Sequence, residues 1–244
     1  MSDTEALVQR ISASVADHMK DNDPSHDIRH VSRVVSLAQN ILAKEQTRDP
    51  SVQYNQTIVT LAAWLHDLAD RKYLPDNQQI NPTTIIRDTL LSHGADPATA
   101  EKVQTIVSNI SYSTEIKNPE AIRHLITHGF PEIAIVQDAD RLDALGAIGI
   151  GRCFTYLGAR TEKTSRKRTD GADGTVGREQ NQPVPCLDEA IEHFKDKLEK
   201  LEGMMKTESG REMARVRARR IIEFRHWWEE EVGDLEKGDQ NIVI

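Results

Sequence analysis

Along almost the whole chain, apolar residues recur at intervals of three and four, and this spacing constrains the fold more than any other feature. A helix that buries one face has that period, whereas a half-buried strand alternates with a period of two. The first segment illustrates the pattern, because Leu7, Ile11 and Val15 form one stripe. No convincing period-2 segment is found, so we predict an all-α protein whose helices pack around a buried core.

Cap residues mark where individual helices should begin and end. Ser2 opens a Ser-Asp-Thr-Glu capping box. A cap residue followed by proline indicates a helix start at three later points, and a glycine after a helix is a typical C-cap. The expected starts are Asn81-Pro82, Asp96-Pro97 and Asn118-Pro119, and the expected C-caps are Gly94 and Gly129.

Longer segments also have predicted bounds. A second helix should begin after Asp23-Pro24-Ser25, and a third should run from about Val52 to Asp70. The apolar segment from Glu132 to about Gly158 is typical of a buried helix, and Thr207 to Glu231 of a long amphipathic one. We expect a single domain over residues 1–244, with a C-terminal helical extension at about 187–235.

The segment from Arg160 to Pro185 differs from the rest of the chain. It has few apolar residues, many turn formers and the basic run Arg166-Lys167-Arg168. A solvated, mobile loop over residues 160–185 is the first interpretation. A lid over the active site, or a patch for nuclear import or polyanion binding, is the functional alternative.

Charge and cysteine content limit the function classes. With 31 basic and 39 acidic residues, the net charge of −8 gives no support for binding to long nucleic acids or membrane surfaces. Two cysteines are too few for a disulfide framework. No apolar run approaches the roughly 18 residues that span a bilayer, and the acidic N-terminus has no signal-peptide core. We therefore expect a cytoplasmic protein, with the nucleus as an open alternative.

The dipeptide His66-Asp67 lies at the end of the apolar run LAAWLHDLAD, where a buried helix should carry leucines. If the helix continues, Asp70 follows one turn later and shares a face with this pair. Burying an imidazole and two carboxylates is costly unless something offsets their desolvation. A bound cation would do so, and the sequence therefore predicts a metal centre in a helical core.

Two other stretches offer further ligands. In SHDIRHVSRV, His26 and His30 are four residues apart, and His30 is in register with the apolar stripe. In VQDADRLDALG, Asp140 and Asp143 share a helical face, whereas Asp138 lies about 200° from Asp140 in a regular helix. Asp138 is therefore either a ligand candidate or only an N-cap.

These pieces occur in a familiar order. HxxRV around His30, then His66-Asp67, then ADRL around Asp140 resembles the HD-domain superfamily of metal-dependent phosphohydrolases. The closer resemblance is to the YedJ-like or YpgQ-like subfamily, and it covers most of the chain from Ser25 to about Glu231. The matching stretches are SHDIRHVSRV, LAAWLHDLADRKY, VSNISYS, VQDADRLDALGAIGIGRCF and HFKDKLEKLEGMMKTESGREMA.

The resemblance implies an all-α HD-domain bundle around one divalent ion, held by His30, His66, Asp67 and Asp140. Mixed nitrogen and oxygen ligands suit Mn²⁺, Fe²⁺, Co²⁺, Ni²⁺ or Mg²⁺. Asp70 matches the position of a carboxylate in related phosphohydrolases, which usually have glutamate there. It is our candidate for the general base, and the alternative is that it orients the His66 ring.

Several residues near these ligands are candidates for binding substrate. Arginine and lysine side chains could hold a phosphate, and Asp143 could contact a nucleotide sugar or base. The alternative for each basic residue is an ordinary surface or ion-pairing role. The substrate-binding candidates are His26, Arg29, Arg33, Lys72, Arg141 and Asp143.

The resemblance implies hydrolysis of a small phosphorylated substrate, in particular a (deoxy)nucleoside triphosphate cleaved to monophosphate and pyrophosphate. A nucleoside monophosphate phosphatase and a guanosine tetraphosphate hydrolase are alternatives within this class. A regulatory module that binds nucleotide or metal without catalysis, and a di-iron oxygenase, are alternatives from other classes. We expect no long nucleic acid and no membrane as partner, and a homodimer stays open.

Overall fold

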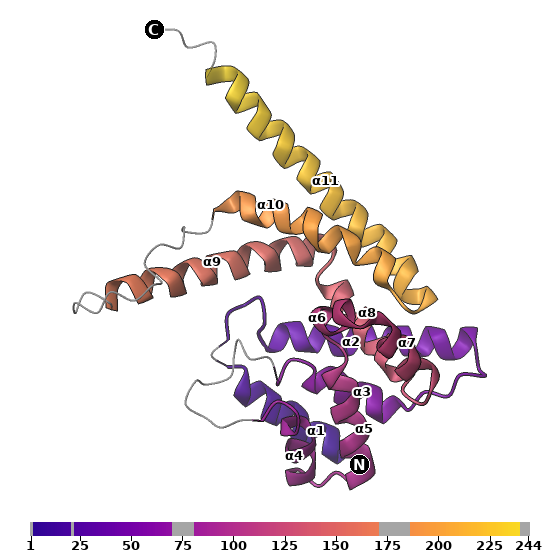
Figure 1. Cartoon of the computed structure of the whole chain (residues 1–244). Helices are drawn as coiled ribbons and strands as arrows, with labels where there is room; N and C mark the ends of the chain where they lie inside the picture. The colour runs from indigo at the N-terminus through magenta and orange to yellow at the C-terminus, as the bar shows by residue number, and fades with distance from the viewer. Residues whose placement is uncertain (1, 21, 70–80, 171–185, 240–244) are drawn as a thin grey trace. The chain divides into compact units, whose positions relative to one another are not determined.

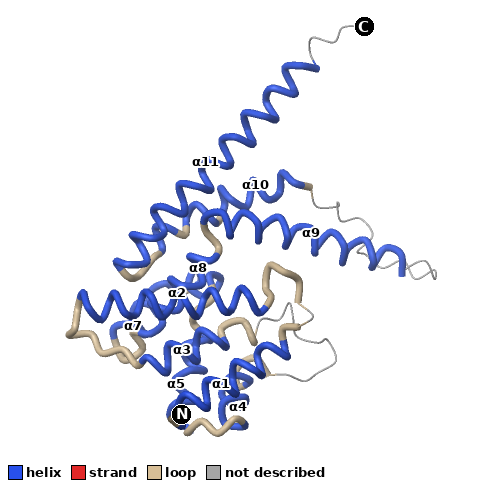
Figure 2. Tube along the Cα trace, turned by 180° about the vertical axis from the view of Figure 1, so that it is seen from behind, coloured by secondary structure: helices blue, strands red, loops and turns tan. Residues whose placement is uncertain are grey.

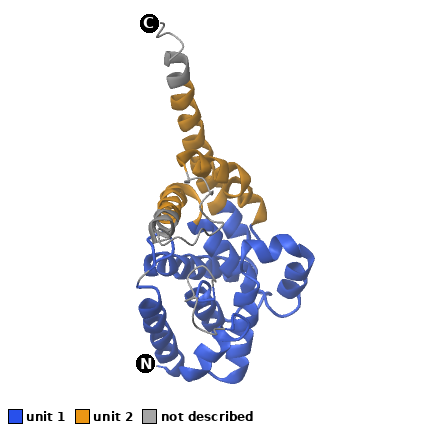
Figure 3. Ribbon diagram, turned by 60° about the vertical axis from the view of Figure 1, so that its left-hand side comes forward, with its two compact units in different colours: residues 1–143, 205–212 blue, residues 144–204, 213–244 orange. Residues whose placement is uncertain are grey.

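The computed structural model describes residues 2–20, 22–69, 81–170 and 186–239, and every regular element in these ranges is helical. Figure 2 shows these helices and the loops that join them, which confirms the all-α prediction. The chain divides into two compact units (Figure 3): residues 1–143 with 205–212, and residues 144–204 with 213–244. The single domain over residues 1–244 stays a prediction.

Unit 1 is the larger unit and has α3 at its centre (Figure 1). Helix α3 packs against α1, α2, α5 and α8, and α2 also packs along α8. Both α3 and α8 are buried along nearly their whole length, so side chains at their C-terminal ends enter the core. Its helices are α1 (Asp3–His18), α2 (Ile28–Arg48), α3 (Gln56–Leu65), α4 (Ile85–Ser92), α5 (Pro97–Ser108), α6 (Tyr112–Lys117), α7 (Pro119–Thr127) and α8 (Glu132–Asp143).

Cap residues located most of the predicted helix starts correctly. Ser2 forms the expected capping box at α1, and Asp96 and Asn118 cap α5 and α7. The start expected at Asn81-Pro82 is wrong, because these residues open a turn and α4 begins at Ile85. Capping depends on hydrogen bonds within one turn, and it can therefore be predicted from local sequence.

Glycines with positive φ end several helices. Gly94 and Gly129, at φ 86° and 114°, follow α4 and α7 as predicted. The continuous helix expected from Glu132 to Gly158 is wrong, because two helices, α8 and α9 (Gly146–Asp170), fill this segment. Gly146 has φ 72°, a left-handed conformation that interrupts a helix and favours glycine.

Two other boundaries differ from those expected. The third helix ends at Leu65 and not at Asp70, and residues 66–69 form turns. No glycine or proline marks this end, so the sequence carries no local stop signal. The loop predicted over 160–185 starts too early, because α9 continues to Asp170. Arginine, lysine and glutamate are frequent in its last turns and favour helix despite their polarity, whereas residues 171–185 lie outside the described residues.

Unit 2 contains α9 and the C-terminal helices. A cluster of aromatic rings joins three of them: Phe154 of α9, Phe194 of α10, and Phe224 with Trp228 of α11, at centroid distances of 5.9 to 6.5 Å. Of the helices described in either unit, none is both long and apolar enough to cross a membrane. Besides α9, the elements are α10 (Leu187–Asp196), η2 (Leu198–Lys200), η3 (Glu202–Met204) and α11 (Glu208–Asp239), whose first residues belong to unit 1.

Candidate metal centre

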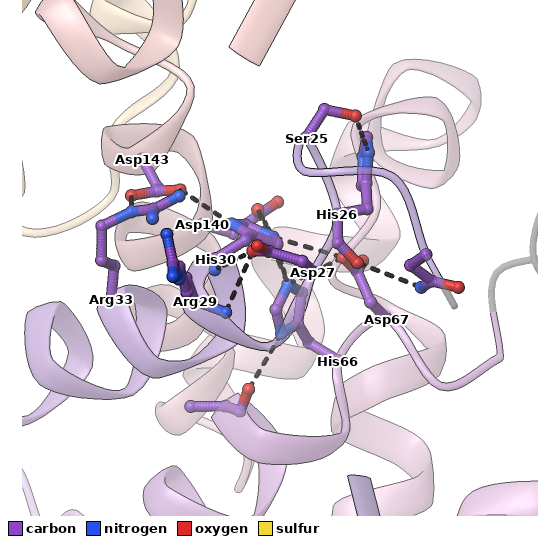
Figure 4. Close-up of polar contacts among 12 residues, drawn as sticks. Ser25, His26, Asp27, Arg29, His30, Arg33, His66, Asp67, Asp140 and Asp143 are labelled. Carbon is purple, nitrogen blue, oxygen red and sulfur yellow. Dashed lines mark hydrogen bonds and ion pairs between the residues drawn. The ribbon is translucent and has the colours of Figure 1, made fainter. Parts of the chain in front are cut away.

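Three helix ends bring the four predicted ligands together inside unit 1 (Figure 4). His30 lies in the first turn of α2, where the Asp27 carboxylate accepts hydrogen bonds from two backbone N–H groups, one of them that of His30. His66 and Asp67 directly follow α3, and Asp140 lies in the last turn of α8. His30 and His66 are buried, and the Asp140 side chain is 33% exposed. The arrangement therefore has a buried nitrogen side and a more accessible carboxylate.

The donor atoms of these side chains converge on one point. The two Nε2 atoms of His30 and His66 are 3.1 Å apart. Asp67 Oδ2 lies 3.2 Å from the first and 3.4 Å from the second, and Asp140 Oδ1 lies 3.7 Å from both. Adjacent ligands of an octahedral ion with bonds of about 2.1 Å are about 3 Å apart. In the described part of the chain, His30, His66 and Asp140 form a group that could hold a metal ion.

Hydrogen bonds on the far side of each imidazole fix its protonation. His66 Nδ1 is 2.8 Å from the Ala63 carbonyl oxygen, which can only accept, so Nδ1 carries the proton. His30 Nδ1 is 2.8 Å from Asp143 Oδ2, a carboxylate that accepts in the same way. When neutral, each ring presents an unprotonated Nε2, and the two lone pairs then face one another at 3.1 Å. This contact is repulsive unless a cation lies between the rings.

Asp67 adds a second sign of a cation site. Its Oδ2 is buried and accepts no hydrogen bond from the described part of the chain, although a buried carboxylate oxygen is normally satisfied. Burial acts to raise the pKa of Asp67, and positive charge on the His66 and His30 rings acts to lower it. With both rings neutral, a bound cation would supply that positive charge and keep Asp67 ionised. Two imidazole nitrogens and two carboxylate oxygens form a mixed donor set that fits a divalent ion.

The structure places the predicted substrate residues in different surroundings. His26 packs edge-on against His30, with ring centroids 5.8 Å apart, and its Nδ1 is 2.8 Å from Ser25 Oγ. Arg29 is exposed at the start of α2. Asp70 and Lys72 lie outside the described residues, so the proposed base stays a prediction.

Arg33 and Asp143 are paired with each other. Arg33 donates from Nε to Asp143 Oδ1 at 2.7 Å and from Nη2 to Oδ2 at 2.9 Å. The hydrogen bond to Asp143 raises the pKa of Arg33 above its ordinary value, despite partial burial. Because Asp143 also meets His30, it reaches the candidate metal centre through that ring. A direct contact of either residue with substrate stays a prediction.

Arg141, which is also on α8, has a different set of charged partners. Its guanidinium is buried and forms an ion pair with Glu115 of α6. Lys206 Nζ also reaches Glu115, at 2.5 Å. Contact between Arg141 and a phosphate, as the sequence suggested, would require it to leave this pair.

Sequence reasoning left the role of Asp138 open, and the structure resolves it. Asp138 lies within α8 and does not cap its own helix. Its carboxylate accepts from the backbone N–H groups of Lys206 and Thr207 at 2.8 and 2.7 Å, and from Thr207 Oγ1 at 2.7 Å. Asp138 therefore accepts the hydrogen bonds of backbone N–H groups at the N-terminus of α11, although Thr207 lies 69 residues further along the chain. Lys206 and Thr207 lie in HFKDKLEKLEGMMKTESGREMA, one of the stretches that carry the family resemblance. Nothing in the local sequence indicates that they contact Asp138.

The helical fold and the convergent His, His and Asp donors define a class, the HD-superfamily hydrolase fold. A solved structure of an HD-superfamily hydrolase from Bacillus thuringiensis matches 94% of the chain and 98% of its own length, with 27% identity and a TM-score of 0.61. The structure of Bacillus subtilis YpgQ in complex with ADP matches 93% of the chain and 96% of its own, with 29% identity and a TM-score of 0.64.

Sequence comparison defines the family more narrowly. The uncharacterized protein YpgQ of Bacillus subtilis is 32% identical over 231 residues, which are 93% of the chain and 95% of YpgQ. No family model matches the chain. The similarity to YpgQ over nearly both lengths shows that the chain belongs to the YpgQ-like family of HD-domain proteins.

Proposed function

We propose that this protein is a divalent-metal-dependent phosphohydrolase that acts on a small nucleotide. The preferred reaction is cleavage of a (deoxy)nucleoside triphosphate to the monophosphate and pyrophosphate. One observation carries the proposal: two imidazole Nε2 lone pairs and two carboxylate oxygens face a common point. The ADP in the solved YpgQ complex supports a nucleotide as the class of ligand.

His30, His66, Asp67 and Asp140 would hold the ion through the atoms that converge in Figure 4. Such an ion supplies Lewis acidity towards a phosphoryl oxygen and lowers the pKa of a bound water. The partly exposed Asp140 marks the side from which a substrate could approach, since the His30 and His66 rings are buried.

In the proposed reaction, a water oxygen bonds to the α-phosphorus while the bond from that phosphorus to the bridging oxygen breaks. Pyrophosphate leaves, and the water proton passes to a base. Asp70, three residues after Asp67, is the proposed base. Arg29, exposed at the start of α2, is the proposed contact for the departing phosphates, together with Lys72.

The test is a screen of the purified full chain with Mn²⁺ or Co²⁺ against nucleoside mono-, di- and triphosphates, with phosphate and pyrophosphate measured separately. We expect metal-dependent pyrophosphate release, which Asp67→Ala should abolish. Asp17→Ala is the matched control, because Asp17 is an exposed carboxylate whose only described role is an ion pair with Lys20 at 3.2 Å.

The alternatives give different outcomes. Release of phosphate alone from monophosphates would favour the phosphatase. Nucleotide binding without turnover would favour the regulatory module. Full activity of Asp67→Ala would refute the assignment of the site.

A further inference from the structure

Two side chains of α2 meet at Asp143, the last residue of α8. His30 contributes Nδ1 at 2.8 Å from Oδ2, and Arg33 donates to both carboxylate oxygens at 2.7 and 2.9 Å (Figure 4). The Asp143 side chain is only 2% exposed. Both carboxylate oxygens thus have charged or polar partners from within unit 1, and the forked contact with arginine is specific in its geometry.

This pairing bears on the charge that faces the candidate metal centre. Arg33 and Asp143 neutralise each other, so among the described residues the carboxylate charges beside the two imidazole Nε2 atoms are those of Asp67 and Asp140. Two negative charges match one divalent cation. Without Arg33, Asp143 would be a third buried negative charge in direct contact with His30, and buried charges are costly unless paired.

The two imidazoles differ in what lies behind them. His66 donates from Nδ1 to an uncharged carbonyl, that of Ala63. His30 donates to the Asp143 carboxylate, and such a contact fixes the tautomer and makes the opposite nitrogen a stronger ligand. The two rings therefore differ in the charge of the group that their Nδ1–H meets.

We propose that Arg33 and Asp143 form a positioning pair for His30, in which Asp143 holds the proton on Nδ1 and Arg33 holds Asp143. The pair turns the Nε2 lone pair towards the metal and does not bind substrate. This assignment deepens the proposed function, because it concerns the same site, and it differs from the substrate roles expected from sequence.

The first test is a titration of Co²⁺ into the metal-free full chain, followed by visible absorption. Asp143→Asn should weaken binding about 10- to 100-fold, the range typical of such outer partners. Arg33→Lys, which keeps the charge but loses the fork, should weaken it less. Arg48→Lys is the matched control, because Arg48 lies on the same helix and forms an exposed pair with Glu212 at 2.9 Å; its affinity should equal wild type.

The second test follows the ring nitrogens of histidine by ¹⁵N NMR in the metal-free protein. His30 should be the Nδ1–H tautomer in wild type and a mixture of tautomers in Asp143→Asn, while His66 keeps its tautomer. A variant that is merely less stable would not change the His30 signal alone. Unchanged affinity and an unchanged His30 tautomer in Asp143→Asn would overturn the proposal.

Nucleotide kinetics at saturating metal separate this role from phosphate binding. A positioning role for Arg33 predicts weaker metal binding with an unchanged KM for nucleotide in Arg33→Lys. A raised KM with normal metal affinity would overturn it. Wild-type protein that binds Co²⁺ but hydrolyses no nucleotide would refute the proposed function alone, whereas hydrolysis with unaffected variants would refute only the pair. Wild-type protein that binds no divalent ion would refute both.

Discussion

Helix α8 contributes a carboxylate to each of two polar clusters, and the carboxylates of the two clusters are satisfied in opposite ways. Asp138 is saturated by protein donors: two backbone N–H groups and one hydroxyl of the segment Lys206-Thr207. Asp140 and the neighbouring Asp67 instead face two unprotonated imidazole nitrogens, and Asp67 Oδ2 accepts no hydrogen bond from the described residues. A carboxylate surrounded by donors needs no cation as a partner, whereas carboxylates that face other bases do.

The glycine beside Asp138 supports this distinction. A Cβ added at Gly210 would lie 2.3 Å from Asp138 Oδ2, so the first turn of α11 packs directly on the carboxylate. Nothing larger than hydrogen fits there, and no ligand is needed. The two clusters should therefore respond differently to mutation: one through folding stability, the other through metal binding.

The largest effect on stability is expected for Asp138→Ala. The change leaves two backbone N–H groups and the Thr207 hydroxyl without their acceptor, and each buried group costs about 1–3 kcal/mol. We expect a loss of about 4 kcal/mol in the free energy of unfolding, measured by urea denaturation. Co²⁺ affinity of the folded protein should stay unchanged.

Asp96→Ala is the control for this change. Asp96 caps its own helix α5 at the surface by accepting from Thr99 N, so its removal should cost clearly less than the removal of the buried Asp138. Equal losses in the two variants would show that Asp138 acts as an ordinary cap. A loss of metal affinity in Asp138→Ala would remove the distinction between the clusters.

A pH-dependent effect is expected for Glu115, which forms ion pairs with Arg141 and Lys206. Lys206 also donates its backbone N–H to Asp138. Burial acts to raise the pKa of Glu115, but the hydrogen bonds and charges of Lys206 and Arg141 outweigh it and lower the pKa from 4.5. Ionised Glu115 thus stabilises the folded state above pH 4.5, and this contribution is lost as the pH falls through the folded-state pKa.

Glu115→Gln should therefore lower the free energy of unfolding by about 3 kcal/mol at neutral pH, because it leaves the buried Arg141 without its carboxylate. The difference from wild type should narrow as denaturation is repeated at lower pH. Glu120→Gln provides the comparison, since Glu120 forms an exposed pair with Arg123 that should contribute less than about 1 kcal/mol. A difference that persists at acid pH would contradict the role of the ionised carboxylate.

The distance along the chain over which a contact acts explains what could be predicted from the sequence. Helix starts at Ser2, Asp96 and Asn118 were predictable because a cap acts within one turn. The end of α3 at Leu65 was not, since nothing in the local sequence stops that helix before His66. The ligands could be selected because polar residues in apolar segments, in the order of a known family, are unusual.

The partners of these ligands could not be predicted in the same way. Asp143 meets His30 across 113 residues, and Asp138 meets Thr207 across 69. Both contacts depend on how α8 packs in unit 1, which no periodicity encodes. The sequence marked Asp140 as a ligand, Asp143 as a substrate contact and Asp138 as a ligand or an N-cap, but it could not name the partners of these aspartates, which the structure shows to be three different sets.

The smallest effect on stability is expected for Asp67→Asn, and it depends on whether a metal ion is present. Because Asp67 Oδ2 accepts no hydrogen bond from the described residues, an amide nitrogen in its place orphans no described donor, and the metal-free protein should change in stability by less than about 1 kcal/mol. Wild-type protein should gain about 2.7 kcal/mol when the free metal concentration is 100 times the Kd. Asp67→Asn should gain almost nothing at that concentration, as measured by urea denaturation with and without Mn²⁺. If Asp67→Asn instead destabilised the metal-free protein as much as Asp138→Ala, Asp67 would belong with the structural carboxylates, and the difference between the two clusters would disappear.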